Sequence, residues 1–174
     1  MHGTRKRPPI VGDNLKPHEL KTLQRFYRSH RQGLLSYALS LTGNRDSAED
    51  AIHTAFAKLL HSEAWPRELS PYMYRAVRNE ALQERRHANR EPATVAIFDG
   101  THNGRDHESE DLLNEALKAL RDEERESVVL KGLNGLTLQE VAEVHSVSIN
   151  TAASWYRRGM TKLRERLEEL ERHE

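Results

Sequence analysis

The stretch from residue 136 to residue 163 constrains the fold most, because it carries the signals of two helices around one tight turn. Thr137 is followed three positions later by Glu140, which is the spacing of a capping box at the start of a helix. The residues after this cap form an apolar stripe made of Leu138, Val141, Ala142 and Val144. His145 and Ser146 then interrupt the stripe. A short helix, a compact turn and a second helix are typical of a helix-turn-helix.

The second helix of this motif is predicted to follow Ser148, which is a favourable N-cap residue. We expect Ile149, Ala152 and Tyr156 to point inward, with basic residues further along the helix. The second helix of a helix-turn-helix enters the major groove of DNA. Nucleic acid is therefore the first partner to consider.

Composition narrows the class of protein further. The chain has 174 residues, of which 36% are hydrophobic, 31% charged and 6% aromatic, and this favours small helical bundles over one large core. It contains no cysteine, which excludes disulfides, thiolate metal sites and a cysteine nucleophile. No secretion signal and no stretch long enough to cross a membrane are present, so we expect a cytoplasmic protein without membrane insertion.

The net charge of zero hides an asymmetry along the chain. Residues 1–92 carry 16 Lys and Arg against 10 Asp and Glu, a balance of +6. Residues 93–110 carry 1 against 4, and residues 111–174 carry 10 against 13, so each has a balance of −3. The first half of the chain is therefore the part suited to approach phosphate.

The predicted fold class is all-α, with two small helical domains joined by a flexible linker. Residues 1–14 contain Pro and Gly without periodicity and are expected to form a disordered arm. Residues 15–90 form the first domain, residues 91–110 the linker, and residues 111–174 the second domain with the helix-turn-helix.

Helix signals within the first domain follow in order. A helical pattern begins at Pro17, and a second one, with Leu34, Leu35, Ala38, Leu39 and Leu41, repeats it and stops at Gly43. The first turns of the first pattern show apolar residues at helical spacing, namely Leu20, Leu23, Phe26 and Tyr27. Ser47 is predicted to open the next helix, with acidic residues in its first turn. Ser70 is predicted to cap another, which begins at Pro71. In the second domain, a helix is expected from Asp111 to Leu120.

Segments of both domains carry a family resemblance. In the first domain these are Ser47-Ala48-Glu49-Asp50-Ala51-Ile52-His53-Thr54-Ala55-Phe56 and Tyr72-Met73-Tyr74-Arg75-Ala76-Val77-Arg78-Asn79. In the second it is Leu138-Gln139-Glu140-Val141-Ala142 with the helices around it. The chain resembles the extracytoplasmic-function (ECF) group of bacterial RNA polymerase sigma factors, which contain sigma regions two and four. The resemblance implies three partners, which are core RNA polymerase, promoter DNA and an anti-sigma factor.

The resemblance also implies a polymerase-binding helix. Its contacts would be Glu49, Asp50, His53 and Phe56. The two acids suit pairing with arginines of a partner. The competing interpretation is that they only neutralise the helix dipole.

The helix after Pro71 would recognise the minus-ten promoter element. The implied DNA-binding residues are Trp65, Arg75, Arg78, Asn79, Arg85 and Arg86. We expect the four arginines to face outward toward phosphates, and Trp65 to offer a stacking face for a base. There is an alternative interpretation for each. Trp65 could be a hydrophobic plug at the edge of the domain, and the arginines could form a solvated helix face without a partner.

The second helix of the helix-turn-helix would read the minus-thirty-five element. The implied contacts are Asn150, Thr151, Ser154 and Trp155 to bases, and Arg157 and Arg158 to phosphates. Ala153 and Trp155 stand where the family usually has basic residues. They leave open a degenerate sigma-like module that binds polymerase or an anti-sigma factor without reading promoters. A plain helix-turn-helix repressor would leave the first domain without a role.

No enzymatic or metal site is expected. Residues 99–110 approach the pattern of a calcium loop, but position three of the loop is Thr101 and not Asp or Asn, which favours a plain linker. The ten histidines form no ligand set, and no nucleophile lies beside a base. We therefore predict no catalytic residue, no metal and no cofactor.

Overall fold

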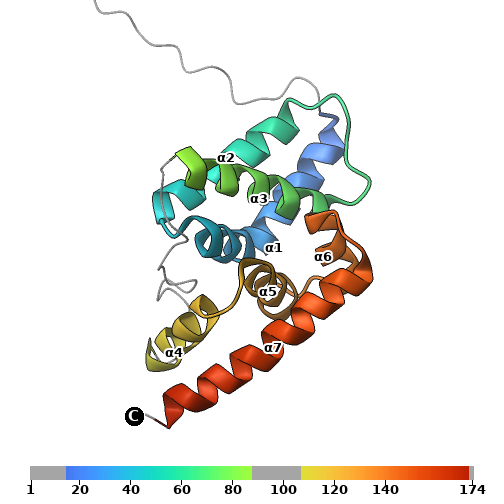
Figure 1. Cartoon of the computed structure of the whole chain (residues 1–174). Helices are drawn as coiled ribbons and strands as arrows, with labels where there is room; N and C mark the ends of the chain where they lie inside the picture. The colour runs from blue at the N-terminus through green and yellow to red at the C-terminus, as the bar shows by residue number, and fades with distance from the viewer. Residues whose placement is uncertain (1–14, 88–106, 173–174) are drawn as a thin grey trace, which may run out of the picture.

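The computed structural model describes residues 15–87 and 107–172, and the regular elements in these ranges are all helical (Figure 1). This confirms the predicted all-α class. The expected arm at 1–14 and most of the expected linker lie outside the described residues. Residues 107–110, which we assigned to the linker, are helical instead. None of the helices in the described part combines the length and apolar character that a membrane span requires.

The N-terminal bundle contains α1 (Pro17–Thr42), α2 (Arg45–Leu60) and α3 (Leu69–His87), each packed against the other two. Its core includes several fully buried side chains, among them Leu34, Tyr37, Leu41, Leu59, Met73, Tyr74 and Val77. Helix α1 joins the two helical segments predicted before Gly43 into one helix, and it stops, as predicted, at Gly43, whose φ of 67° suits a residue without a Cβ. At the N-terminal end of α1, Leu23 and Phe26 are buried, whereas Leu20 and Tyr27 are 37% and 38% exposed at the rim of the bundle.

Two predicted helix starts in this bundle are wrong. Helix α2 begins at Arg45, because the side chain of Asn44 accepts a hydrogen bond from the backbone N–H of Ser47 and acts as the N-cap. Helix α3 begins at Leu69, so that Ser70 and Pro71 both lie inside its first turn. Proline is tolerated there because the first amides of a helix have no partner within it.

The C-terminal bundle contains α4 (His107–Lys118), α5 (Asp122–Ser127), a π-helix η1 (Val128–Leu133), α6 (Leu138–His145) and α7 (Ile149–Glu171). The first of these begins before the predicted Asp111. Helices α4, α5 and α6 all pack along α7. A Cβ at Gly159 would lie 2.9 Å from the carbonyl oxygen of Glu124, so this glycine permits the close approach of α7 to α5.

The two bundles pack against each other in the structure. Helix α6 contacts α3, and η1 contacts α1 (Figure 1). The side chain of Asn134 donates a hydrogen bond of 3.0 Å to the carbonyl oxygen of Gly33 across this interface. Buried hydrophobic residues of the two bundles form one continuous cluster. The two predicted helical parts are therefore successive segments of the chain. In the described part of the structure they pack into one body.

Candidate nucleic-acid and polymerase interfaces

The helix-turn-helix is formed by the local signals that predicted it. The hydroxyl of Thr137 accepts the backbone N–H of Glu140 at 3.1 Å, and the Glu140 carboxylate accepts the backbone N–H of Thr137 at 2.8 Å. Ser146 then takes a left-handed conformation with φ 58° and ends α6. Ser148 caps α7 by accepting the backbone N–H of Thr151. These caps fix both helix ends and hence the angle between the helices.

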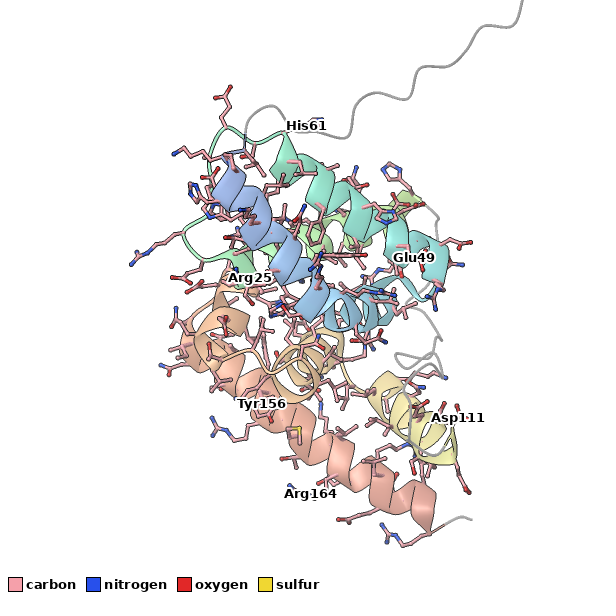
Figure 2. All side chains as sticks on the ribbon, turned by 180° about the vertical axis from the view of Figure 1, so that it is seen from behind. Arg25, Glu49, His61, Asp111, Tyr156 and Arg164 are labelled. Carbon is pink, nitrogen blue, oxygen red and sulfur yellow. The ribbon has the colours of Figure 1, made fainter. Side chains whose placement is uncertain are left out.

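Helix α7 has one face buried against the bundle and one face open to solvent, as the helical spacing of its buried residues shows. Ala152, Gly159 and Leu163 are buried and Tyr156 is half-buried, so this face packs on the bundle. Ile149 was predicted to point inward, but it is 45% exposed because it occupies the first position of the helix, beyond the packed face. Figure 2 shows Tyr156 and Arg164 along α7, and Arg164 is exposed.

The residues predicted to read DNA lie mainly on the other face of α7. Asn150 and Arg157 are exposed, while Thr151 and Ser154 are partly exposed. Trp155 is partly buried and its ring meets His145 edge-on, with 5.4 Å between ring centroids, so it also packs the turn. Arg158 is exposed but lies 3.4 Å from the Glu124 carboxylate. The face is therefore polar and accessible, with one arginine drawn toward α5.

The basic residues of α3 divide into two groups. Arg75, Asn79 and Arg86 are exposed and follow each other at helical spacing on one face. Arg78 and Arg85 were predicted to face outward as well, and this is wrong. Their side chains are only 24% and 22% exposed, because they sit at the flank of the buried stripe and turn toward the C-terminal bundle.

Arg78 meets a buried carboxylate of α5. Its Nε donates to Glu126 at 2.7 Å, and its Nη2 donates at 3.3 Å. The hydroxyl of Tyr37 on α1 donates to the same carboxylate at 2.7 Å. Arg85 pairs more loosely with Asp122, at 3.7 Å between Nη1 and the carboxylate. Helices α1 and α3 of the N-terminal bundle therefore both donate hydrogen bonds to Glu126 of α5 in the C-terminal bundle.

The pKa values of the groups around Glu126 reflect burial and charge. Burial raises the pKa of Tyr37 well above its usual value, and the adjacent Glu126 carboxylate adds to this. Burial alone lowers the pKa of Arg78, but the hydrogen bond and charge of Glu126 outweigh it and the net shift is upward. Burial lowers the pKa of His145, whose Nε2 lies 3.7 Å from Glu126. At neutral pH the cluster thus holds an arginine cation, a neutral phenol and a neutral imidazole.

Trp65 lies in the loop between α2 and α3. It is half-buried and packs against the hydrophobic cluster, as the plug interpretation required, while part of the ring stays accessible. An open groove of about 820 Å³ begins beside this loop and runs between α3 and α6. Its walls include Tyr72 and Arg75 of α3 and Gln139 and Glu143 of α6.

The predicted polymerase contacts lie on α2. Asp50 and His53 are exposed, and Glu49 is partly exposed with Arg45 paired to it at 2.8 Å. Phe56 is half-buried, with its ring edge-on to Tyr27 at 5.2 Å. Since α2 begins at Arg45, Asp46 is the acid of its first turn, and Glu49 and Asp50 lie further along, where the helix dipole contributes little. Figure 2 places Glu49 near the start of α2, on the opposite side of the molecule from α6.

Sequence reasoning missed the acids that organise the interface. Glu126 stands two positions before the apolar run from Val128 to Leu130, which was the only signal in the sequence that it is buried. Nothing in the sequence paired it with Tyr37 or Arg78. Among the described residues, no group of three or more His, Asp and Glu side chains comes together as a metal site would require.

A helical bundle with a polar arginine face, packed on a second bundle with a helix-turn-helix, defines the class as an all-helical nucleic-acid-binding protein. The family profile for Sigma-70 region 2 matches residues 26–91, and the profile for Sigma-70 region 4 matches residues 110–163. The chain belongs to the ECF group of RNA polymerase sigma factors. Below, region two denotes residues 15–87 with α1 to α3, and region four denotes residues 107–172 with α4 to α7.

Individual relatives agree with this assignment. RNA polymerase sigma factor CarQ of Myxococcus xanthus is 29% identical over 160 residues, which cover 83% of this chain and 88% of CarQ. The fold resembles sigma factor RpoE of Bartonella quintana, solved with the anti-sigma factor NepR, with a TM-score of 0.67 and 23% identity over 85% of this chain and 98% of that one. It also resembles CnrH, solved with the cytosolic domain of CnrY, with a TM-score of 0.64 and 18% identity over 86% and 89%.

Proposed function

We propose that region two binds the minus-ten element of a promoter through the arginine face of α3. The observation that carries this proposal is the row of Arg75, Asn79 and Arg86, which are exposed on one face of α3, with Arg75 lining the groove beside the Trp65 loop. Guanidinium groups pair with phosphates, and an aromatic ring can stack on an unpaired base. When region four is not packed on α3, Arg78 and Arg85 add two further guanidinium groups to the DNA-binding surface of this helix.

Region four reads the minus-thirty-five element in this proposal. Asn150 is placed at the exposed start of α7, where residues of a recognition helix reach base edges. Thr151, Ser154 and part of Trp155 extend this surface, and Arg157 suits a phosphate. Ala153 and Trp155 give the helix a less basic reading surface than is usual, which predicts an uncommon promoter sequence.

Core polymerase is held through α2 in this proposal. Asp50 and His53 are exposed, and the Arg45 partner of Glu49 is exchangeable because an exposed ion pair within one helix contributes only about 0.3–0.5 kcal/mol. Phe56 is half-buried on the same helix, and its ring packs against Tyr27 of α1. The protein acts in the cytoplasm as a specificity subunit and performs no catalysis itself.

An anti-sigma factor is the third partner we propose. RpoE of Bartonella quintana was solved with the anti-sigma factor NepR, and CnrH was solved with the cytosolic domain of CnrY. The open groove between α3 and α6 borders both regions, so a partner seated there would contact region two and region four together.

Run-off transcription from genomic fragments tests the proposed function. Core RNA polymerase is assayed alone, with the wild-type protein, and with the double variant Arg75→Ala/Arg86→Ala. We expect discrete transcripts only with the wild-type protein and a loss of at least about tenfold in the double variant, because each lost phosphate contact weakens binding. The matched control is Arg28→Ala, an exposed arginine of α1 on no proposed surface.

Binding to polymerase is measured on the same proteins. A protein that binds core polymerase without producing any transcript would favour the degenerate module over a promoter-reading factor. Failure of Glu49→Ala/Asp50→Ala to weaken polymerase binding would contradict the role given to α2.

A further inference from the structure

Helix α7 begins with an exposed apolar residue. At 45% exposed, Ile149 is the most accessible of the large hydrophobic side chains among the described residues. It occupies the first position of α7, and Ala153 follows one turn later and is partly exposed. Residues four positions apart are neighbours on one side of a helix, so the two side chains form a single apolar patch. This pair is called the Ile149 patch below.

The turn before α7 is anchored without Ile149. Val147 stands directly before the Ser148 cap and packs against the hydrophobic cluster, at the position of a hydrophobic staple. Ser148 accepts the backbone N–H of Thr151 at 3.1 Å, which fixes the first turn of the helix. Ile149 is therefore held in place while its side chain stays in water. An apolar group in this position gains free energy when a partner covers it.

The Ile149 patch is continuous with the polar reading surface of α7. The adjacent row of the helix carries Asn150 and Ser154, which are also four positions apart. Arg157 follows Ala153 by one turn, is exposed, and extends the apolar row with a group suited to phosphate. A helix in the major groove presents two such neighbouring rows to the base edges together. The patch therefore meets bases wherever Asn150 does.

Thymine is the base of DNA that presents an apolar group in the major groove. Its C5-methyl lies beside the O4 acceptor, whereas the other three bases present amino groups, ring nitrogens or a carbonyl oxygen. Covering the methyl with Ile149 removes apolar surface from water on both sides. Covering a polar edge with the same side chain would leave a donor or acceptor without a partner. Both effects favour thymine opposite the patch.

We propose that Ile149 and Ala153 recognise the C5-methyl group of a thymine in the minus-thirty-five element, beside the base that Asn150 contacts. This rests on the proposed function, because it needs α7 to lie in the major groove. The patch sets the identity of one base pair, while Arg157 adds affinity that does not depend on sequence. Promoters of this protein therefore carry a thymine at a fixed position of the element.

The test removes one methyl group from the DNA and leaves base pairing intact. Core polymerase with the full chain is bound to the fluorescein-labelled promoter that run-off transcription identifies. Each thymine of the minus-thirty-five element, on either strand, is replaced in turn by deoxyuridine, which keeps O4 and lacks the C5-methyl. Competition measured by fluorescence anisotropy gives the affinities. We expect a sensitive position at which affinity falls about fourfold, as for one apolar carbon returned to water.

Protein variants assign the methyl contact to the patch. Ile149→Ala should weaken binding to the natural promoter and bind thymine and deoxyuridine equally well at the sensitive position. Because Ile149 is exposed, this change should leave the midpoint of thermal unfolding unchanged. The matched control is Leu133→Ala, which shortens another exposed hydrophobic residue of region four and should keep the preference for thymine. Arg157→Ala should weaken binding to both DNAs by the same factor.

Two outcomes would overturn the proposal. One is that no thymine of the element responds to deoxyuridine, and the other is that the response persists in Ile149→Ala. Arg157→Ala then separates this failure from failure of the proposed function. If Arg157→Ala still weakens promoter binding, α7 contacts DNA but does not read thymine through the Ile149 patch. If neither Arg157→Ala nor Ile149→Ala changes promoter binding, region four does not bind this element.

Discussion

Arg78 of α3 donates two hydrogen bonds to Glu126 of α5 although the residues are 48 positions apart in the sequence. The pair is buried on the Glu126 side and joins the two regions. A double-mutant cycle of Arg78→Ala and Glu126→Ala should give an interaction energy of about 1–3 kcal/mol in urea unfolding, as contacting residues in one network do. The exposed pair of Lys118 and Glu115 within α4 is the comparison, and about 0.3–0.5 kcal/mol is expected there. Equal values for the two pairs would show that the interdomain pair is not a desolvated contact.

Ser146 occupies a backbone conformation that favours glycine. Its φ of 58° lies in the left-handed region, which costs a residue with a Cβ roughly 1–2 kcal/mol. Glycine avoids this strain, but it costs about 0.5–1 kcal/mol because a glycine loses more conformational entropy on folding. We therefore expect Ser146→Gly to raise the free energy of unfolding by about 0.5 kcal/mol, measured by urea denaturation. Gly43→Ala, at φ 67°, should change it in the opposite direction by about 1 kcal/mol. A loss of stability in Ser146→Gly would contradict this account of the turn.

His145 gives the protein a pH-dependent stability. Burial lowers its pKa below the usual 6.5, with Arg78 acting in the same direction, while Glu126 and Glu123 oppose the shift. The unfolded chain then binds this proton more tightly than the folded protein does. The free energy of unfolding therefore falls as pH drops below about 6.5, by less than about 1.4 kcal/mol per pH unit, and this loss is absent above neutrality.

The histidine effect is isolated by comparing variants. His145→Gln should lose less stability than the wild-type protein as the pH falls below about 6.5, where the imidazole of the unfolded chain gains its proton before the buried one does. His53→Gln, which removes an exposed histidine of α2, should keep the wild-type pH dependence. An identical pH dependence in wild type and His145→Gln would refute the burial argument.

Asn150 and Arg157 should respond differently when they are changed. Asn150→Ala should relax base preference at one position of the minus-thirty-five element, with a cost of about 1–3 kcal/mol for the preferred base. Arg157→Ala should weaken binding to all sequences about equally. It should also reduce the slope of log K against log salt concentration by about 1, as expected for the loss of one phosphate contact. Holoenzyme binding to promoter variants at several salt concentrations separates the two effects. A uniform loss in Asn150→Ala would remove it from the reading surface.

Local signals were readable from the sequence because the residues involved are close neighbours. The capping box of Thr137 and Glu140, the Ser148 cap and the stop at Gly43 each depend on contacts within four positions. The start of α2 was missed because Asn44 and Ser47 are both good caps, and only the fold selects one.

Long-range pairing was not readable in the same way. Tyr37 and Glu126 are 89 positions apart, and no pattern in either segment names its partner. Helical periodicity correctly placed Arg75 and Arg86 on the surface. It failed for Arg78 and Arg85 because their exposure depends on how region four packs, and that packing is not encoded within α3.

Permanganate footprinting of the promoter identified by run-off transcription tests the central claim most directly, because it detects thymines unpaired by the holoenzyme. The wild-type protein with core polymerase should make thymines at the minus-ten element reactive. Arg75→Ala/Arg86→Ala should bind polymerase normally and lose most of this reactivity, while Arg28→Ala keeps it. Reactivity that is unchanged in the double variant would contradict the claim that the exposed face of α3 engages promoter DNA.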